Sequence, residues 1–340
     1  MPKGPNVGDN IIDLATKKIL YSVFPNAEIY SFRSHPHAAF YYGKTDIGKH
    51  DLMAGIREHS LNFSKKPDLI VIGGAPTWAT SSLVSMDTKT ITGTGAPIAF
   101  IGSGSKYYSD KSNRENFINK INDIKNLILI ASARDEPTFI DMKHHGINAY
   151  MTGCPVMHYI GDNIMHKDSD FFIISFRDSK PLRMIKITRR FIKKLEEILK
   201  AKHLIVFHDY REVHLAGNLG GDVRYIVEYN PENLVPFYRN AKFVLSYRLH
   251  GTLLATTCGA PFLQIGNDGR CSDFAKTFDI ENKYTLSHTN LTVDNILDRV
   301  REIMESKEKY DYKDYGERIE KARKNLEDFK SELRRLTAKH

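Results

Sequence analysis

Short apolar runs alternate with longer amphipathic stretches along most of the chain. The apolar runs are continuous and rich in Ile, Val and Phe, which is typical of strands buried in a parallel sheet. The predicted strands are Glu28–Phe32, Leu69–Ile72, Ile98–Ile101, Leu127–Ser132, Phe171–Phe176, His203–His208 and Phe243–Tyr247. The predicted helices between them include Asn10–Ser22, Arg114–Ile124, Ile187–Lys200 and Asn233–Arg239. This alternation predicts an α/β fold with parallel sheets covered on both faces, in which ligands bind at the carboxyl ends of the strands.

The alternation is interrupted by a polar stretch between Tyr159 and Asp170. We therefore predict two α/β halves, residues 1–165 and 166–340, each with its own parallel sheet and facing each other across a cleft. From about Thr292 the pattern becomes helical, with a break at Tyr310–Tyr315. The apolar stripe of this part consists of Ile296, Val300, Ile303, Met304, Ile319, Ala322, Leu326, Phe329 and Leu333. The chain is expected to end in a helical tail.

Composition places the chain among globular proteins, since 41% of its 340 residues are hydrophobic and 26% are charged. No apolar run approaches the roughly 20 residues of a membrane helix, and the polar start of the chain lacks a secretory pattern. Cys154, Cys258 and Cys271 are widely spaced and include no CxxC pair. This spacing argues against a disulfide framework and against a cysteine-built zinc site. We expect a cytoplasmic protein.

The 49 Lys and Arg residues outnumber the 41 Asp and Glu residues, which gives a net charge of +8. Much of this excess lies between Arg183 and Lys194, at helical spacing. Such a run fits a solvated helix face, an acidic lipid surface or nucleic acid. We predict a solvated face or peripheral contact with an anionic membrane at its inner side, and no nucleic-acid partner.

Glycine or small polar residues follow several predicted strands and precede helices. Glycine lets backbone amides approach a ligand closely, and helix N-termini attract anions. The candidates are Asn6–Asn10, in which Asp9 or Asn10 could cap the first helix, then Gly73–Gly74, Gly102–Ser105 with Ser103 and Gly104, and Gly251. Each of them also fits an ordinary tight turn. The chain has neither the GxGxxG fingerprint of dinucleotide-binding folds nor the GxxxxGK[ST] loop of nucleotide triphosphatases.

The most informative stretch is FVLSYRLHGTLLATTCGAP, residues 243–261. Arg248 and His250 are two positions apart, so on an extended strand they would project to the same side. A guanidinium binds carboxylate or phosphate, and a neighbouring imidazole can move a proton near neutral pH. The fixed Arg also lowers the pKa of the imidazole unless a bound anion offsets it. The alternative is structural: a buried Arg paired with an acid such as Asp268, and a core His bonded to backbone.

SARDEPT, residues 132–138, is the matching feature of the first half, because it also follows an apolar strand. Asp135 is expected to cap the next helix, with Pro137 in its first turn. Arg134 would then point a second guanidinium toward the cleft. Two arginines from facing halves suit a small substrate with two or more negative charges.

Taken in order, these motifs resemble the polysaccharide pyruvyl transferases. The resemblance covers roughly residues 6 to 275 and is most specific in SYRLH and the GAP that follows it. It implies two Rossmann-like domains, as in GT-B glycosyltransferases, and transfer of the enolpyruvyl-derived group of phosphoenolpyruvate to a sugar, where it forms a pyruvate ketal. Arg248, Leu249 and His250 match the R-L-H motif of the family, and Arg134 matches its SxRD arginine. Asp9 matches the aspartate of the GD pair, on the acceptor side.

The chain departs from the family pattern at three places. The usual GGG loop reads Gly73-Gly74-Ala75, and the histidine that several members carry after that loop is absent. Arg270 stands where members often have a lysine. With this resemblance we expect catalytic roles for His250, Arg248 and Arg134, with His158 or His208 as the next candidates for the acid. The expected substrate-binding residues are Leu249, Gly251, Asp9, Asn10, Gly73, Gly74, Ser103, Gly104 and Arg270.

No metal and no cofactor beyond phosphoenolpyruvate as donor substrate are expected, since no HxxxH ligand pair is present on a helix. The expected partners are phosphoenolpyruvate and a surface glycan or its lipid-linked precursor. Loops such as Ser34–Asp51 are expected to choose the sugar. Two alternatives remain at this stage: a GT-B glycosyltransferase that uses a nucleotide sugar, and a non-catalytic glycan- or anion-binding relative.

Overall fold

The computed structural model describes residues 7–29, 67–74, 78, 88–105, 111–159, 169–176, 181–209, 212–219, 223–228, 230–266, 268–306 and 313–339. Its internal contacts divide the chain into two compact units. The four-strand unit consists of Thr16–Thr152 and Asn325–His340, and the six-strand unit of Met1–Ala15 and Gly153–Lys324. The loop Ser34–Asp51, expected to choose the sugar, lies outside the described residues.

The four-strand unit contains one parallel sheet whose strand order follows the chain, β1-β2-β3-β4. Its strands are β1 (Ile70–Gly73), β2 (Ile98–Ser103), β3 (Ile128–Ala133) and β4 (Ala149–Met151). The connecting helices are α4 (Thr88–Thr94), α5 (Lys111–Ile124), the 3₁₀ turn η2 (Lys125–Leu127) and α6 (Glu136–His144). The carboxyl ends of the strands therefore lie along one edge of this sheet.

Successive side chains of β2 point into two different hydrophobic clusters of the four-strand unit. Ile98 and Phe100 pack in one cluster with α4, α5 and α6, and Ala99 and Ile101 pack in the other. The second cluster is completed by apolar residues from the C-terminal parts of α1 (Val7–Val23) and α14 (Lys313–Thr337). Successive side chains of a strand point to opposite faces, so one buried run serves two helical layers.

The six-strand unit contains a parallel sheet of order β10-β9-β8-β5-β6-β7. Its strands are β5 (Phe171–Ser175), β6 (Lys202–Phe207), β7 (Tyr225–Val227), β8 (Val244–Ser246), β9 (Phe262–Gly266) and β10 (Thr285–Ser287). Counted from β5, this is the doubly wound Rossmann order 3-2-1-4-5-6, read from its other end. The order reverses between β5 and β8, which are hydrogen-bonded neighbours. This switch point is where ligands bind in open α/β sheets.

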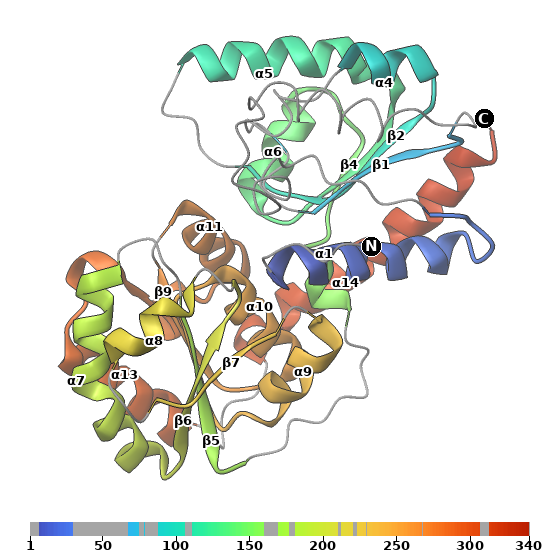
Figure 1. Ribbon diagram of the computed structural model, residues 1–340. Helices are drawn as coiled ribbons and strands as arrows, with labels where there is room; N and C mark the ends of the chain where they lie inside the picture. Colours follow the sequence, from blue (N-terminus) through green and yellow to red (C-terminus); the bar gives the residue numbers. More distant parts are fainter. Residues whose placement is uncertain are drawn as a thin grey trace, which may run out of the picture. The chain divides into compact units, whose positions relative to one another are not determined.

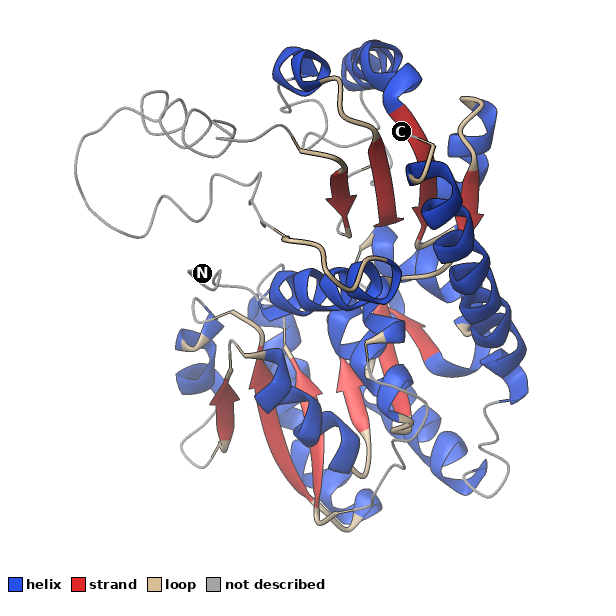
Figure 2. Ribbon diagram, turned by 90° about the vertical axis from the view of Figure 1, so that its right-hand side faces the viewer, coloured by secondary structure: helices blue, strands red, loops and turns tan. Residues whose placement is uncertain are grey.

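Helices of the six-strand unit form two packed groups, with the sheet between them (Figure 1). Contacts join α7 (Pro181–Leu199) to α8 (His214–Leu219) and α13 (Val293–Glu305). A second set of contacts joins α10 (Leu249–Cys258) to α9 (Pro231–Asn240), α11 (Gly269–Phe278) and the 3₁₀ turn η3 (Pro155–His158). Two short segments, α12 (Glu281–Tyr284) and η5 (His288–Asn290), flank β10. Helices and strands alternate along the chain in each unit, as expected. Figure 2 shows both sheets with helices beside them.

The long helices α1 and α14 each contribute to both units, since the unit boundaries fall at Ala15 and Lys324 inside them. In between, the chain passes from one unit to the other at Thr152 and Gly153. The sequence-based division at residue 165 differs from this one, because it places the N-terminal helix wholly in the first half and the C-terminal helix wholly in the second. A pattern of apolar runs cannot reveal that a terminal helix spans two cores.

Six of the seven predicted strands are present, within two residues at each end. The prediction at Glu28–Phe32 is wrong for its first two residues, which lie in a loop where Ile29 packs on the α1 and α14 cluster. Residues 30–32 lie outside the described part of the chain. The helical tail is confirmed as α13 and α14, separated near the predicted break. Cys154, Cys258 and Cys271 are buried, and none of them is in a disulfide.

Candidate functional site

The switch point of the six-strand sheet ends in two serines. Ser175 closes β5, Ser246 closes β8, and the two are directly paired in the sheet. Gly251, in the first turn of α10, lies against both hydroxyls, and a Cβ there would come within 2.7 Å of Ser175 Oγ. The glycine thus lets the N-terminus of α10 approach the carboxyl ends of the strands closely.

Arg248 and His250 lie at this N-terminus. The expectation that both project from an extended strand is wrong, because β8 ends at Ser246 and α10 begins at Leu249. Arg248 is the N-cap residue, and His250 belongs to the first helical turn. Ser246 holds the turn, since its hydroxyl donates to the Arg248 carbonyl (2.7 Å) and accepts from the Arg248 N–H (3.2 Å).

The Arg248 guanidinium has protein partners. Its Nε–H donates to the carbonyl oxygen of Phe176 (2.6 Å), and its Nη2 forms an ion pair with Glu212. The exposed fraction of the side chain is 11% for Arg248 and 4% for Glu212. The acid that pairs with Arg248 is therefore Glu212 and not Asp268, the example considered from the sequence.

His208 lies directly after β6, beside the same site. Its Nε2 is 2.8 Å from the Tyr238 hydroxyl and 3.3 Å from Ser175 Oγ. Burial holds the pKa of His208 well below its usual value, and the positive charges of Arg248 and His250 lower it further. The imidazole of His208 is therefore neutral at pH 7.

The first turn of α1 packs on this edge of the six-strand unit. The Val7 N–H donates to the His208 carbonyl oxygen (2.9 Å), and Gly8 lies against the His250 ring. Because α1 begins at Val7, Asp9 and Asn10 lie within the helix and do not cap it, contrary to expectation. Asn10 is buried and Asp9 is exposed.

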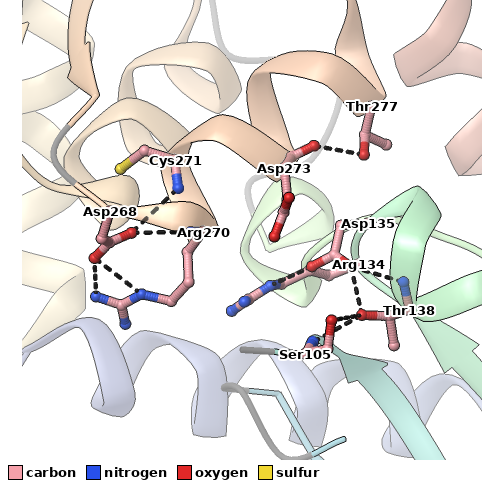
Figure 3. A network of polar contacts seen from close by, with 9 residues as sticks. All are labelled: Ser105, Arg134, Asp135, Thr138, Asp268, Arg270, Cys271, Asp273 and Thr277. Atoms are coloured by element: carbon pink, nitrogen blue, oxygen red, sulfur yellow. Dashed lines mark hydrogen bonds and ion pairs between the residues drawn. The ribbon is translucent and has the colours of Figure 1, made fainter. Parts of the chain in front are cut away.

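Arg270 lies in the first turn of α11, next to the helix cap. Asp268 accepts hydrogen bonds from the N–H groups of Arg270 (3.0 Å) and Cys271 (3.2 Å), and its carboxylate also binds the Arg270 side chain (Nη2 to Oδ2, 2.6 Å; Figure 3). Burial lowers the pKa of Arg270, but the hydrogen bond and charge of Asp268, with a contribution from Asp9, raise it above its usual value. Asp9 and Arg270 therefore interact electrostatically within one unit.

The second set of candidates lies at the carboxyl edge of the four-strand sheet. The Arg134 N–H donates to the Ser103 carbonyl (2.9 Å), and its guanidinium lies against Gly104, where a Cβ would overlap it. Arg134 Nε binds Asp135 Oδ2 (3.1 Å; Figure 3). Arg134 is only 3% exposed, and its Nη2 finds no hydrogen-bond partner among the described residues. A buried donor of this kind is suited to an anionic ligand group.

Asp135 caps α6, as predicted, by accepting from the Thr138 N–H (3.1 Å), with a proline in the first turn. Thr138 in turn accepts from the Ser105 N–H (2.7 Å), which ties the loop after β2 to α6 (Figure 3). Gly73 and Gly74 end β1 on the same edge. Gly73 packs on the Thr16 side chain, and Gly74 adopts a left-handed backbone with φ +51°.

A comparison with protein families identifies the family of this chain. The model for polysaccharide pyruvyl transferases matches residues 6–269. The chain belongs to this family. No curated protein matches it. The resemblance seen in the motifs is thus confirmed, and both sheet-edge clusters lie in a member of this family.

Solved structures with the same fold come from other enzymes. A putative UDP-N-acetylglucosamine 2-epimerase from Listeria monocytogenes superposes with a TM-score of 0.59 at 13% identity, over 96% of this chain and 93% of that one. UDP-GlcNAc 2-epimerase from Neisseria meningitidis, solved with UDP-GlcNAc, gives 0.55 at 16% identity, over 92% and 87%. These likenesses show the fold alone. The pyruvyl transferase has two Rossmann-like units of GT-B type, as predicted.

Each of the three arginines predicted for the site of this pyruvyl transferase forms an ion pair with a carboxylate of the protein. Arg134 pairs with Asp135, Arg248 with Glu212 and Arg270 with Asp268. The arginines are therefore fixed before a ligand arrives, and their charges are partly compensated. Among the described residues, no group of three His, Cys, Asp or Glu side chains is placed to hold a metal ion.

Sequence reasoning missed two residues of the site. Glu212 lies 36 positions from Arg248, and no local pattern links them. Gly8 was noticed only as part of a glycine-rich turn, whereas it contacts His250. The sequence suggested His208 only as an alternative acid. In the structure its carbonyl oxygen accepts a hydrogen bond from α1, and its ring contacts Tyr238 of α9 and Ser175 of β5. His158, the other reserve acid, ends the 3₁₀ turn η3.

Proposed function

We propose that this pyruvyl transferase moves the enolpyruvyl-derived group of phosphoenolpyruvate onto two hydroxyls of one sugar, in a surface polysaccharide or its lipid-linked precursor. The observation that carries the proposal is the pair Arg248 and His250, fixed at a helix N-terminus on the switch point of a doubly wound sheet. A guanidinium and the backbone amides of a helix N-terminus both suit the carboxylate and phosphate of phosphoenolpyruvate.

In the proposed reaction, His250 donates its proton to the vinyl CH₂ carbon, which becomes a methyl group. The adjacent carbon becomes oxocarbenium-like, and the first sugar hydroxyl adds to it with loss of its proton. Phosphate then leaves with the electrons of the carbon–oxygen bond, and the second hydroxyl closes the ketal and loses its proton. Of the two hydroxyl protons, one restores His250 and one leaves with phosphate, so the protons balance.

The arginines supply charge neutralisation in this scheme. Arg248 and Arg270 lie in the six-strand unit, which is the proposed donor side, and Arg134 is proposed as a further anion ligand through its buried Nη2. Side chains held by carboxylates need little reorganisation when charge develops, and this preorganisation is the main source of electrostatic catalysis. No cofactor takes part in the scheme.

We also infer peripheral contact with an anionic membrane through α7, since the acceptor can be lipid-linked. Its buried side includes Phe191 and Leu195, and its exposed side presents Arg189, Arg190, Lys193 and Lys194. No helix in the described part of the chain is long and apolar enough to span a bilayer. Sedimentation with vesicles tests the inference: binding should require anionic lipid and weaken as salt rises. Equal binding to neutral vesicles would reduce α7 to a solvated face.

Phosphate release tests the proposed function. The protein is incubated with phosphoenolpyruvate and candidate glycans, and in parallel with UDP-sugars. Phosphate release that requires both phosphoenolpyruvate and a glycan supports the proposal. Release of nucleotide from a UDP-sugar would instead favour a glycosyltransferase, and release of neither would favour a binding protein.

A further inference from the structure

We propose that Glu212 is a positioning residue that holds Arg248 in the orientation needed to bind the donor anion. This inference rests on the proposed function. The first observation is the kind of pairing. Asp135 and Asp268 lie one and two positions from the arginines they bind, and both also cap helices. The partner of Arg248 comes instead from the segment before α8, 36 positions away.

The second observation is which edge of the guanidinium is occupied. Nε and Nη2 share one edge of this planar group, and both bind protein, through the Phe176 carbonyl and Glu212. A ligand is left with the edge shared by Nη1 and Nη2, which still offers two parallel N–H groups. The Phe176 carbonyl and Glu212 together therefore fix the direction in which Arg248 can receive an anion.

The third observation is burial. Glu212 is a nearly buried carboxylate, and Arg248 is almost as enclosed. A charge in such a place is costly without a partner, so each group holds the other. With Glu212 removed, Arg248 keeps one tether, at Nε, and its positive charge is no longer offset. Affinity for an anion is then maintained by charge, while the orientation that serves catalysis is lost.

The test is a double-mutant cycle of Glu212→Gln and Arg248→Ala. Glutamine keeps the shape of Glu212 and removes its charge. We expect Glu212→Gln to bind phosphoenolpyruvate as tightly as wild type in calorimetry, while kcat falls by up to about a hundredfold, the loss that a displacement of about 1 Å can cause. In the Arg248→Ala background, the same substitution should cost nothing more. An equal loss in both backgrounds would show a structural role and overturn the proposal.

Glu196→Gln is the matched control, because Glu196 also pairs with a basic side chain, His203 (3.0 Å), in the same unit. It should leave kcat unchanged. A second readout is independent of turnover: the ¹⁵N signal of the Arg248 Nε–H, identified by its loss in Arg248→Ala. This signal should shift in Glu212→Gln and not in Glu196→Gln, and an unshifted signal in Glu212→Gln overturns the proposal. If wild type itself does not use phosphoenolpyruvate, the proposed function fails, and this signal alone decides whether Glu212 orients Arg248.

Discussion

Substituting Gly8 by alanine should displace the imidazole of His250, the proposed acid, more than it weakens the fold. Gly8 lies in the first turn of α1, and the neighbouring Val7 N–H is fixed to the His208 carbonyl (2.9 Å). A Cβ at Gly8 would lie 2.6 Å from Cε1 and 2.7 Å from Cγ of His250, and closer still to Nδ1. The helix cannot retreat without losing its bond to His208, so the ring must move.

The size of the effect follows from these distances. Carbon atoms in contact prefer about 3.5–4.0 Å, so the ring must move by about 1 Å or more. A displacement of about 1 Å at a reacting group can cost about a hundredfold in turnover. Helix propensity acts in the opposite direction, because alanine stabilises a helix by about 0.8–1.0 kcal/mol relative to glycine. We therefore expect kcat to fall by about a hundredfold while the melting temperature does not drop in proportion.

The assay is phosphate release at saturating phosphoenolpyruvate, together with thermal unfolding of each variant. Gly217→Ala is the matched control, since Gly217 lies in α8 of the same unit and a Cβ there meets nothing within 4 Å. Gly217→Ala should retain wild-type turnover. If Gly8→Ala turns over as fast as Gly217→Ala, the contact between Gly8 and His250 does not position the imidazole, and the reasoning fails.

Three further predictions concern the charged groups of the six-strand unit. Arg248→Ala should stay folded and lose activity by about 10- to 150-fold, because a charge-assisted hydrogen bond is worth about 1.5–3 kcal/mol; wild-type kcat/KM would contradict its role. His250→Gln should still bind phosphoenolpyruvate in calorimetry but lose about 10²- to 10⁴-fold in turnover, and an unchanged pH profile would move the acid elsewhere. His208 has a lowered pKa in the folded state, so the unfolded chain binds the extra proton below its ordinary pKa near 6.5. As pH falls from about 6.5 to about 5, wild type should therefore lose up to about 1.4 kcal/mol more free energy of unfolding per pH unit than His208→Asn. Chemical denaturation at several pH values measures this, and an equal loss in both proteins would contradict it.

The fold was largely predictable because continuous apolar runs mark buried parallel strands. The missed strands have physical reasons. β4, β7 and β10 have three residues each and are mostly only partly buried. β8 is equally short, but it is fully buried and the buried Phe243 and Tyr247 extend its apolar run. β9 has five, but a glutamine interrupts its apolar run; Gln264 is buried there because its side chain donates to the Cys271 carbonyl (3.0 Å). Such a bond forms only in the folded chain.

The site was predictable where chemistry is local. Short motifs contain Arg248, His250 and the helix cap Asp135, and the residue types in these motifs indicate anion binding and helix capping. The pairing of Arg248 with Glu212 and the contact of Gly8 with His250 join distant parts of the chain. The orientation of Arg248 and His250 also depends on where α10 begins. Because the helix starts at Leu249, Arg248 is its N-cap and His250 lies in its first turn, whereas the sequence predicted both residues on a strand.

Mass spectrometry of the acceptor tests the central claim most directly. Candidate glycans are incubated with phosphoenolpyruvate and either wild type or His250→Gln, and each product is analysed for the mass of an added pyruvate ketal. The account predicts that this mass appears with wild type, in step with the phosphate released, and is nearly absent with the variant. Phosphoenolpyruvate consumed with no ketal on any glycan, or an equal yield from the His250→Gln variant, would contradict it.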